Sequence, residues 1–376
     1  MTLYNRDITS AINEWLNSRE ILIIYGTRQV GKSTLLKMML GDRDDVMILN
    51  CERPSVNEIL QSRDLTRIMA LFGEKKVIAL DEAQVIENIG QVLKLIYDEE
   101  PGIKMYVTGS SSFELSNRIT EPLTGRNIKF QLYPFSVHEI SEQKTWLWIV
   151  EHLQELLIYG SYPGVLDLSA EKKKIKLAEL TGDYLFKDIL IHEGIKQSGI
   201  LLKLVRLLAF QTGNLTSINE LSMELGISIP TVQKFIDLLE KTFVIFSLSS
   251  YSSNLRNEIK KRKKYYFYDL GIRNAVIGNF SAAESRTDTG MLWENFCMTE
   301  RIKYNQVNNP HVQSYFWRTY DGAEIDLIEV KDQQISAFEF KWNPRKKPGM
   351  PASFQAIHPN ATYQVIHPDN LNMFLI

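Results

Sequence analysis

The chain has only two cysteines in 376 residues, and it has no long apolar run. Cys51 and Cys297 lie too far apart in the sequence to form a metal-ligand cluster, so we predict no structural zinc and a reducing, cytoplasmic setting. The best apolar stretch, Ile200–Phe210, is shorter than the ~18 residues of a membrane span and is interrupted by two cations. Met1–Ser18 lacks a basic start followed by an apolar block, so we expect neither a membrane segment nor a signal peptide.

An excess of one charge is also missing, since 43 Lys and Arg are balanced by 45 Asp and Glu. With 44% apolar and 23% charged residues, the composition is that of a globular protein and excludes a disordered or collagen-like chain. At roughly 100–200 residues per domain, the length predicts two to four domains. Charge is uneven locally, because residues 251–265 hold six cations and one acid, and Arg345–Lys347 form a second basic cluster. A solvated surface is the alternative interpretation of either run.

About the first 135 residues alternate short apolar strands with helical patterns. The strands are rich in Ile and Val, as buried parallel strands are. We expect them at Glu20–Tyr25, Val46–Asn50, Lys76–Leu80, Ile103–Thr108 and Asn127–Leu132. The alternation predicts an α/β fold in which helices cover both faces of a sheet. After Pro134 the pattern becomes mostly helical, and from Lys264 onward a mixed region ends in strands.

A phosphate-binding motif follows the first expected strand. The pattern G-x-x-x-x-G-K-[ST] is matched at every fixed position by Gly26, Thr27, Arg28, Gln29, Val30, Gly31, Lys32 and Ser33, and Thr34 continues into a helix. Glycines let the backbone wrap a phosphate, and the helix N-terminus adds positive potential. We expect Lys32 to reach the β- and γ-phosphates and Ser33 to ligate Mg²⁺. A glycine-rich turn without a ligand is the alternative, against which the strand and helix on either side argue.

Two carboxylates follow another expected strand, Val77–Leu80. Asp81 at the strand end can hold Mg²⁺ through water, and Glu82 is placed to polarise the attacking water, as hydrolysis requires. A solvated acidic turn is the alternative. A phosphate-binding loop earlier in the chain favours the catalytic interpretation.

Two further residues are candidates for the same site. Ser110, in the hydroxyl-rich tract Thr108–Ser112, could touch the γ-phosphate or the water, or could simply cap a helix. Arg126 precedes the last expected strand of the sheet, and an arginine there can project into a neighbouring subunit and stabilise transition-state charge. A surface salt bridge is the alternative for Arg126.

The order of these motifs resembles a bacterial and archaeal family of AAA+ ATPases. The matching segments are Gly26–Thr34, Val77–Gln84, Tyr106–Ser112, Leu123–Arg126, Leu132–Ser136 and Tyr159–Val165. The resemblance implies ATP with Mg²⁺, a strand order of 5-1-4-3-2, a helical lid and a homo-oligomer such as a hexameric ring. It makes Lys32, Asp81 and Glu82 the Walker residues and places Arg126 at the finger position. No clear lid arginine of the sensor-2 type is found near Gly160–Gly164.

The middle of the chain predicts a DNA-binding unit. Residues 216–228 read as a helix, a glycine turn and a helix start capped by Ser228, and Thr231–Lys241 continues the second helix before a strand at Phe243–Ser250. This order resembles a winged helix, with a basic cluster near the wing at Lys260, Lys261, Arg262, Lys263 and Lys264. These cations could contact DNA phosphates, including those of branched DNA, without reading sequence. A linker between domains is the alternative.

A hairpin near the C-terminus brings acids together. A symmetric turn at Lys331–Gln334 would place Asp326 opposite Glu339, with Lys341 on the same face. Opposed like charges destabilise a hairpin unless something compensates, and a second Mg²⁺ or a Mn²⁺ would do so. Glu294, in an amphipathic helix, supplies a third carboxylate.

Together, Glu294, Asp326 and Glu339-x-Lys341 resemble the PD-(D/E)xK pattern of restriction-endonuclease-like nucleases. An active nuclease, a degenerate DNA-binding domain of the same fold, and a salt-bridged face stay open. We predict an ATPase core at 1–140, a helical lid at 141–195, a winged-helix-like domain at 196–255 and a nuclease-like domain at 256–376. The functional hypotheses are an ATP-driven motor or remodelling enzyme on DNA, and a nucleotide switch that binds a protein partner.

Overall fold

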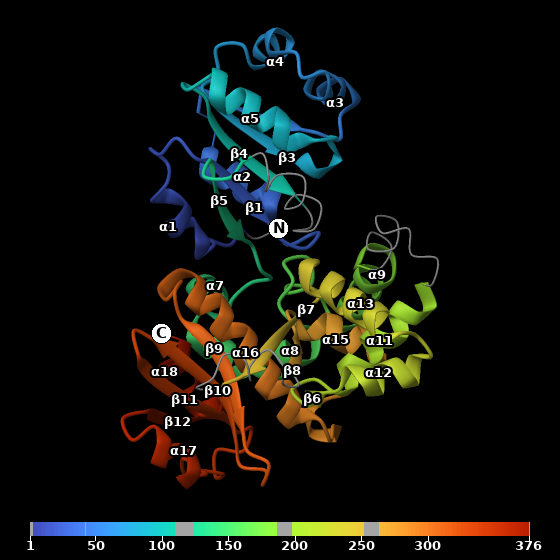
Figure 1. Ribbon diagram of the computed structural model, residues 1–376, viewed down its shortest axis with the longest axis vertical. Coiled ribbons are helices and arrows are strands. Elements are labelled where there is room, and N and C mark those ends of the chain that lie inside the picture. The colour runs from blue at the N-terminus through green and yellow to red at the C-terminus, as the bar shows by residue number, and fades with distance from the viewer. Residues whose placement is uncertain (1–2, 42, 110–122, 186–197, 252–262, 376) are drawn as a thin grey trace. The chain divides into compact units, whose positions relative to one another are not determined.

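The computed structural model describes residues 3–41, 43–109, 123–185, 198–251 and 263–375 (Figure 1). The chain forms two compact units. The N-terminal unit comprises Asn5–Tyr133 with Lys241–Phe243, and the C-terminal unit comprises the remaining residues. Each unit has its own sheet and its own hydrophobic core.

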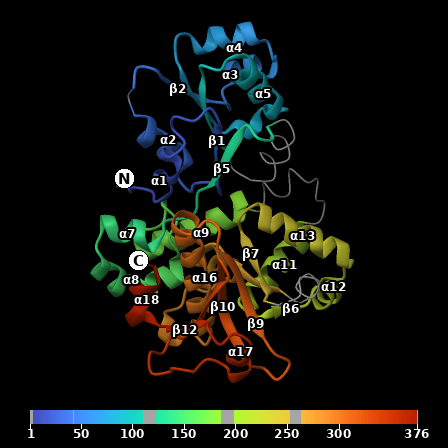
Figure 2. The same ribbon diagram turned by 60° about the vertical axis from the view of Figure 1, so that its left-hand side comes forward.

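The N-terminal unit contains a five-stranded parallel sheet in the order β2-β3-β4-β1-β5 (Figure 2). Its strands are β1 (Ile21–Tyr25), β2 (Val46–Asn50), β3 (Val77–Asp81), β4 (Lys104–Gly109) and β5 (Asn127–Gln131). All five strands expected from the sequence are present, and their order is the one that the family resemblance implied. The prediction succeeded for the inner strands because they are short apolar runs, as parallel strands buried on both faces are. The edge strand β5 (Asn127–Gln131) alternates polar and apolar residues and is only partly buried.

Helices cover both faces of this sheet, as predicted. On one face lie α1 (Ile8–Asn13) and α2 (Lys32–Leu40). On the other lie α3 (Pro54–Gln61), α4 (Leu65–Phe72) and α5 (Ile89–Glu99). In β1, Ile21 and Ile23 pack toward α3–α5, while Leu22 and Ile24 pack toward α1 and α2. This alternation buries every apolar residue of the strand and fixes the loop that follows it.

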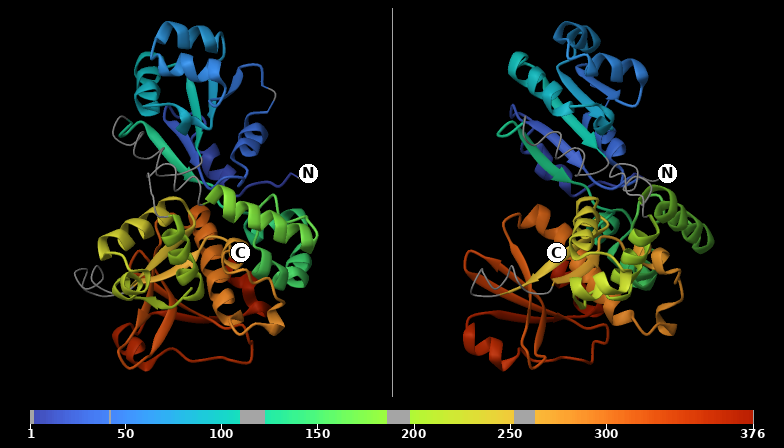
Figure 3. Two further views of the ribbon diagram at one scale, coloured as in Figure 1. Left: turned by 90° about the vertical axis from the view of Figure 1, so that its right-hand side faces the viewer. Right: turned by 45° about the vertical axis from the view of Figure 1, so that its right-hand side comes forward.

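The C-terminal unit is built on a seven-stranded mixed sheet in the order β12-β11-β10-β9-β7-β8-β6 (Figure 3). The strands are β6 (Leu215–Thr216), β7 (Ile245–Ser250), β8 (Lys263–Phe267), β9 (Gln313–Arg318), β10 (Glu324–Lys331), β11 (Gln334–Phe340) and β12 (Thr362–Ile366). Parallel pairing of Ser249 with Tyr315 joins β7 to β9. The sheet therefore continues from β6–β8 into the C-terminal strands β9–β12. The predicted division at 140, 195 and 255 stays a prediction.

Helices and short helical turns pack around this sheet. They are α7 (Val137–Gln143), α8 (Trp146–Tyr159), α9 (Ala170–Glu179), η2 (Leu180–Leu185), α11 (Ser198–Phe210), α12 (Ile218–Leu225), α13 (Ile229–Lys241), α15 (Leu270–Ile277), η3 (Ala283–Ser285), α16 (Thr289–Asn308), α17 (Ala352–Ile357), η4 (Pro368–Asn370) and α18 (Leu371–Leu375). None of the helices in the described ranges is long and apolar enough to cross a membrane.

The predicted helix-turn-helix is present as α12 and α13. Ser217 caps α12 by accepting a hydrogen bond from the Glu220 backbone, and Gly226 ends the helix in a left-handed conformation with φ of 65°. Ser228 accepts from the backbone of Thr231 and so begins α13, as expected. These caps satisfy backbone groups that the helix termini leave unpaired.

The predicted C-terminal hairpin also forms with the predicted register. β10 and β11 pair antiparallel from Lys331 opposite Gln334 to Leu327 opposite Phe338. The two turn residues, Asp332 and Gln333, have φ of 49° and 67°, so the turn is a two-residue left-handed one. The next residues beyond the paired stretch are Asp326 and Glu339, which the hairpin brings to the same end.

Candidate functional site

The phosphate-binding loop lies between β1 and α2 and depends on its glycines. A Cβ at Gly26 would lie 2.2 Å from the carbonyl oxygen of Leu132, so only glycine fits there. Gly31 has φ of 100° and Gln29 has φ of 60°, both in the left-handed region. The backbone thus curves tightly between a buried strand and a helix N-terminus, which is the geometry that wraps a phosphate.

Lys32 begins α2 and is almost completely buried, with 3% of the residue exposed. Its Nζ donates to the carbonyl oxygens of Gly26 (3.0 Å) and Thr27 (2.9 Å). Burial lowers the pKa of the Lys32 ammonium to about 8, against the opposing charges of Glu82 and Asp81. The loop's own carbonyls therefore hold the ammonium beside both carboxylates.

Other loop residues differ in exposure. Arg28, Gln29 and Thr34 are exposed, Ser33 is half-buried, and Val30 is buried in the core beneath the loop. Arg6, which the sequence analysis missed, donates from Nη1 to the carbonyl oxygen of Val30 at 2.9 Å. No motif surrounds Arg6, so its role becomes visible only in the fold.

The carboxylates Asp81 and Glu82 are positioned by the neighbouring strand β4. Thr108 Oγ1 donates to Asp81 Oδ1 (2.5 Å) and accepts from the backbone N–H of Glu82 (3.2 Å). β3 and β4 pair in parallel up to Leu80 opposite Val107, so Asp81 and Thr108 come next to each other. One hydroxyl therefore contacts both the Asp81 carboxylate and the Glu82 backbone.

Glu82 adopts φ of 55° as the chain turns from β3 into η1 (Ala83–Val85). Its Oε2 accepts a hydrogen bond from Gln84 Nε2 at 2.6 Å. Gln84 is a further residue that the sequence analysis missed, because a glutamine two positions after an acid is not a motif. In the tract Thr108–Ser112, Thr108 makes these contacts, whereas the candidate Ser110 lies outside the described residues and its role stays a prediction.

Arg126 precedes β5 and pairs with Asp98, with 2.9 Å between Nε and Oδ1. About one third of its side chain is exposed (32%). This is the surface ion pair that the sequence analysis kept as the alternative, and exposed pairs of this kind are weak. A role across a subunit interface stays a prediction.

ATP binding is expected to weaken as pH rises above 8, because the Lys32 pKa of about 8 makes the free ammonium lose its proton there. Anionic phosphates favour the charged form, so binding must take up a proton at higher pH, and the Kd should rise about tenfold between pH 7 and pH 9. Calorimetric titration with a non-hydrolysable ATP analogue measures this. A Lys32→Arg control keeps its charge and should bind with a flat pH profile. An equally flat profile for the wild type would contradict the prediction.

A second constellation lies in the C-terminal unit around Lys264. The candidate acids Glu294 on α16 and Asp326 on β10 are joined there by Glu324, which the sequence analysis had not included in the site. Lys264 Nζ lies 3.1 Å from Glu294 Oε1, 2.5 Å from Glu324 Oε1 and 3.8 Å from Asp326 Oδ1. Only 2% of Lys264 is exposed. We define these four residues, with Glu339, as the acidic cluster.

Lys264 is therefore not available as a DNA contact, and its prediction as one was wrong. A run of cations does not reveal which of them a strand turns inward. Lys263, next to it, is exposed and donates to Ser247 Oγ at 3.3 Å. Lys260, Lys261 and Arg262 lie outside the described residues.

The far side of the acidic cluster is formed by β11. Lys341 donates to Glu339 Oε1 (2.5 Å) and lies 4.0 Å from Asp326 Oδ2, which also accepts from the backbone of Phe340 at 2.9 Å. Burial raises the pKa of Glu339 and of Glu294, and the charge of Asp326 raises both further. Burial also raises the pKa of Asp326, which the charge of Lys264 opposes.

The structure gives no support to a second divalent metal in this arrangement. Across the described ranges, no group of three or more His, Cys, Asp or Glu side chains is arranged to hold a metal ion. The Mg²⁺ or Mn²⁺ expected at Glu294, Asp326 and Glu339 is therefore unsupported. The repulsion that the hairpin predicted is real, but Lys264 and Lys341 compensate it.

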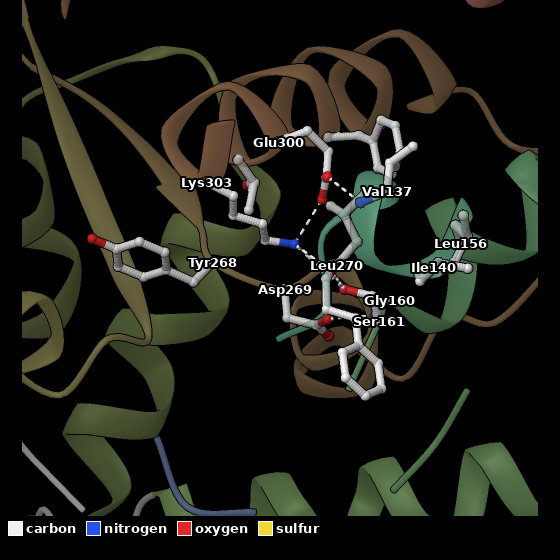
Figure 4. Close-up of a pocket in the computed structure, with 13 residues that line it drawn as sticks. Val137, Ile140, Leu156, Gly160, Ser161, Tyr268, Asp269, Leu270, Glu300 and Lys303 are labelled. Carbon is white, nitrogen blue, oxygen red and sulfur yellow. Dashed lines mark hydrogen bonds and ion pairs between the residues drawn. The ribbon is translucent and has the colours of Figure 1, made fainter. Parts of the chain in front are cut away.

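A small pocket with both apolar and polar lining residues lies elsewhere in the C-terminal unit (Figure 4). Glu300 on α16 accepts from Lys303 Nζ and from the backbone of Val137, both at 2.6 Å. Asp269 accepts from the backbone of Ser161 at 2.8 Å. The cavity measures about 20 Å³, room for about one water molecule. Lys303 on α16 also donates to Ser161 Oγ at 3.4 Å, which joins the loop after α8 to α16. The cavity itself is too small for a substrate.

Family comparisons agree with the fold of the N-terminal unit. Residues 18–141 match a family model described as an AAA domain. Residues 150–283 and 289–373 match two domains of unknown function, DUF8612 and DUF4143. A restriction-endonuclease-like C-terminal domain thus has no support from the family comparison.

Uncharacterized proteins of two bacteria are similar to this chain in sequence. The chain is 25% identical over 346 residues to an uncharacterized protein of Mycobacterium tuberculosis, covering 91% of this chain and 74% of that one. It is 27% identical over 339 residues to an uncharacterized protein of Haemophilus influenzae, covering 84% and 80%. Among solved structures, a Walker-type ATPase of Pyrococcus abyssi matches with a TM-score of 0.52 and 18% identity, covering 73% of this chain and 96% of that one. Residues 18–141 are thus similar to an AAA domain in sequence, and the chain shares the fold of a Walker-type ATPase.

Proposed function

We propose that the protein binds ATP with Mg²⁺ and hydrolyses it. The observation that carries this proposal is the tight loop between β1 and α2, where Gly26 and Gly31 let the backbone curve around the Lys32 ammonium. Ser33 and Asp81 would hold Mg²⁺, which when bound neutralises phosphate charge. The loop Gly26–Thr34 would enclose the phosphates.

The chain's own groups then divide the remaining work. Lys32 would exchange its contacts with loop carbonyls for phosphate oxygens. Glu82 would take a proton from the attacking water, and Thr108 would keep Asp81 and the Glu82 backbone in place. Arg126 would act from a neighbouring subunit of a homo-oligomer such as a hexameric ring.

We infer that the protein uses ATP hydrolysis to act on DNA. The helix-turn-helix presents Gln233 and Lys234 on the exposed side of α13, and Lys263 is exposed at the start of β8. Even without Lys264, the segment 251–263 carries five cations. Such a segment favours contacts with phosphates rather than with bases.

For the nuclease-like C-terminal domain, we retain the hypothesis that it binds DNA but does not cleave it. The order α16-β9-β10-β11-α17-β12, with Asp326 on the second strand and Glu339 on the third, supports the resemblance in fold. The burial of Lys264 among the acids argues against DNA cleavage. It also favours the second candidate, a nucleotide-controlled switch that binds a protein partner, because Lys264 is then no longer one of the exposed cations of the basic segment.

ATPase rates with no DNA, linear duplex DNA and branched DNA test the proposal. We expect DNA to stimulate the rate, and binding to fall by about a hundredfold between 50 and 200 mM salt if four phosphate contacts are made. Neutralising Lys260, Lys261, Arg262 and Lys263 together should abolish the stimulation. Neutralising Arg345, Lys346 and Lys347 is the matched control, and should leave it intact. ATPase activity without any DNA binding or stimulation would exclude DNA as the substrate and favour the protein-binding switch.

A further inference from the structure

We propose that Lys264 is the built-in cation of the acidic cluster and takes the place of a divalent metal there, so that the C-terminal unit neither needs nor binds one. The resemblance to PD-(D/E)xK nucleases assigns a metal to Glu294, Asp326 and Glu339, and the structure disagrees with that assignment. The inference concerns the C-terminal unit alone and does not depend on ATP hydrolysis.

The position of Lys264 is determined by strand alternation. In β8, Tyr265 and Phe267 pack into the core with α11 and α13, whereas Tyr266 packs into the core with α16. Lys264 is two residues before Tyr266 and therefore shares its face. Tyr266 donates to Glu294 Oε1 at 2.8 Å, the same oxygen that Lys264 contacts.

The surroundings of the ammonium are closed. Lys264 Nζ lies 5.6 Å from the ring centre of Phe316. A Cβ at Gly213 would lie 3.0 Å from Glu294 Oε1, so the backbone before β6 packs directly against that acid. A buried ammonium is tolerated only where carboxylates surround it, and here Glu294, Glu324 and Asp326 do so.

A metal would have to compete for oxygens that already have partners. Glu294 Oε1 and Asp326 Oδ1 face Lys264, and Asp326 Oδ2 accepts from the Phe340 backbone. Glu339 Oε1 accepts from Lys341, which leaves Glu339 Oε2 buried and without a partner in the described part of the chain. Mg²⁺ keeps several of its waters but still needs one or two carboxylates to bind it. A metal at Asp326 would lie close to the ammonium groups of Lys264 and Lys341, whose positive charges would repel it.

The consequence is a change of role for these acids. A lysine cannot activate water as a metal does. Unlike a metal ion, however, Lys264 is part of the chain and cannot dissociate. The cluster thereby ties β8 to α16 and β10, and so ties the winged-helix-like strands to the C-terminal strands. Whatever the unit binds, it does so without a metal at this site.

The first test uses the full-length, nucleotide-free wild type. Mn²⁺ binding is measured by electron paramagnetic resonance for the wild type and for Asp326→Asn. We expect both proteins to bind the same amount of Mn²⁺. Thermal unfolding in EDTA, Mg²⁺ and Mn²⁺ should give the same Tm, since a ligand that binds the folded state would raise it. A Mn²⁺-dependent rise in the wild-type Tm that disappears in Asp326→Asn would overturn the proposal, and this arm requires no variant of Lys264 to fold.

The second test replaces Lys264 by methionine, which has a similar length and no charge. Three carboxylates then lose their cation, and we expect the Tm to fall by roughly 10 °C. Mn²⁺ should restore several degrees, and the double variant Lys264→Met/Asp326→Asn should not respond to it. Lys263→Met is the matched control on the adjacent exposed lysine, and should keep the wild-type Tm.

Two outcomes of this second test would count against the inference. An unchanged Tm in Lys264→Met would show that the ammonium is not needed among the acids. If the Tm of Lys264→Met is lowered and Mn²⁺ does not raise it, Lys264 only forms a buried ion pair and does not take the place of a metal. Neither outcome bears on the ATPase proposal, which is measured separately by ATP turnover.

Discussion

Replacing Glu82 by glutamine is expected to slow ATP hydrolysis by about 10²–10⁴-fold while ATP binding is retained. Glutamine has the same size and can still accept a hydrogen bond from Gln84, which now donates to Glu82 Oε2 at 2.6 Å. It cannot accept a proton from water. The Thr108 hydroxyl should still hold the backbone of residue 82, because that contact uses the N–H and not the side chain.

Single-turnover hydrolysis and equilibrium ATP binding, measured on the same preparation, separate the two effects. Lys32→Ala provides the contrast, because it should lose binding itself. Glu87→Gln is the matched control, since Glu87 is an exposed acid in the same segment, and it should turn over normally. Near-normal turnover by Glu82→Gln would exclude Glu82 as the general base.

Replacing Arg126 by alanine is expected to reduce ATP hydrolysis by roughly 10³–10⁵-fold, the range of an arginine finger in phosphoryl transfer. Arg126 stands at the entry to β5 and pairs only with Asp98 among the acids that the structure places within salt-bridge distance. An exposed pair of this kind contributes about 0–1 kcal/mol, so a subunit interface could separate it at little cost. Asp98→Asn is the matched control and should leave the rate nearly unchanged.

Mixing subunits shows whether Arg126 acts in its own site or in a neighbour's. Arg126→Ala and Lys32→Ala subunits are each inactive alone for different reasons. If the arginine crosses an interface, a mixed oligomer contains sites with an intact Lys32 and an intact Arg126, and part of the ATPase activity should return. An oligomer that demonstrably exchanges subunits but recovers no activity would refute the finger role.

Local patterns were enough to predict much of the fold. Four of the five strands of the N-terminal sheet were predicted because they are mostly apolar runs, and the helix-turn-helix because a glycine turn and the cap Ser228 separate its two helices. The C-terminal hairpin register followed from a symmetric two-residue turn at Asp332 and Gln333. In each case the deciding interactions join residues close in sequence, so the pattern contains them.

Contacts between distant segments were not predictable in this way. Thr108 reaches Asp81 only because β3 and β4 are neighbours in the sheet, and Arg6 supports Val30 only because the N-terminal segment packs beneath the loop. Neither contact leaves a periodic or spaced signal, because 27 residues separate the first pair and 24 the second.

The basic run and the acidic hairpin show the division most clearly. From sequence alone, Lys263 and Lys264 are equivalent cations, and Asp326 with Glu339 is an acid pair that requires a counter-charge. The sequence determined that repulsion and the register that creates it. Only the tertiary structure decided which cation compensates this repulsion. The alternation of β8 turns Lys264 toward α16 and leaves Lys263 in solvent. A strand exchanges its two faces with a shift of one residue, so the packing of Tyr266 and Phe267 on opposite sides sets the role of each lysine.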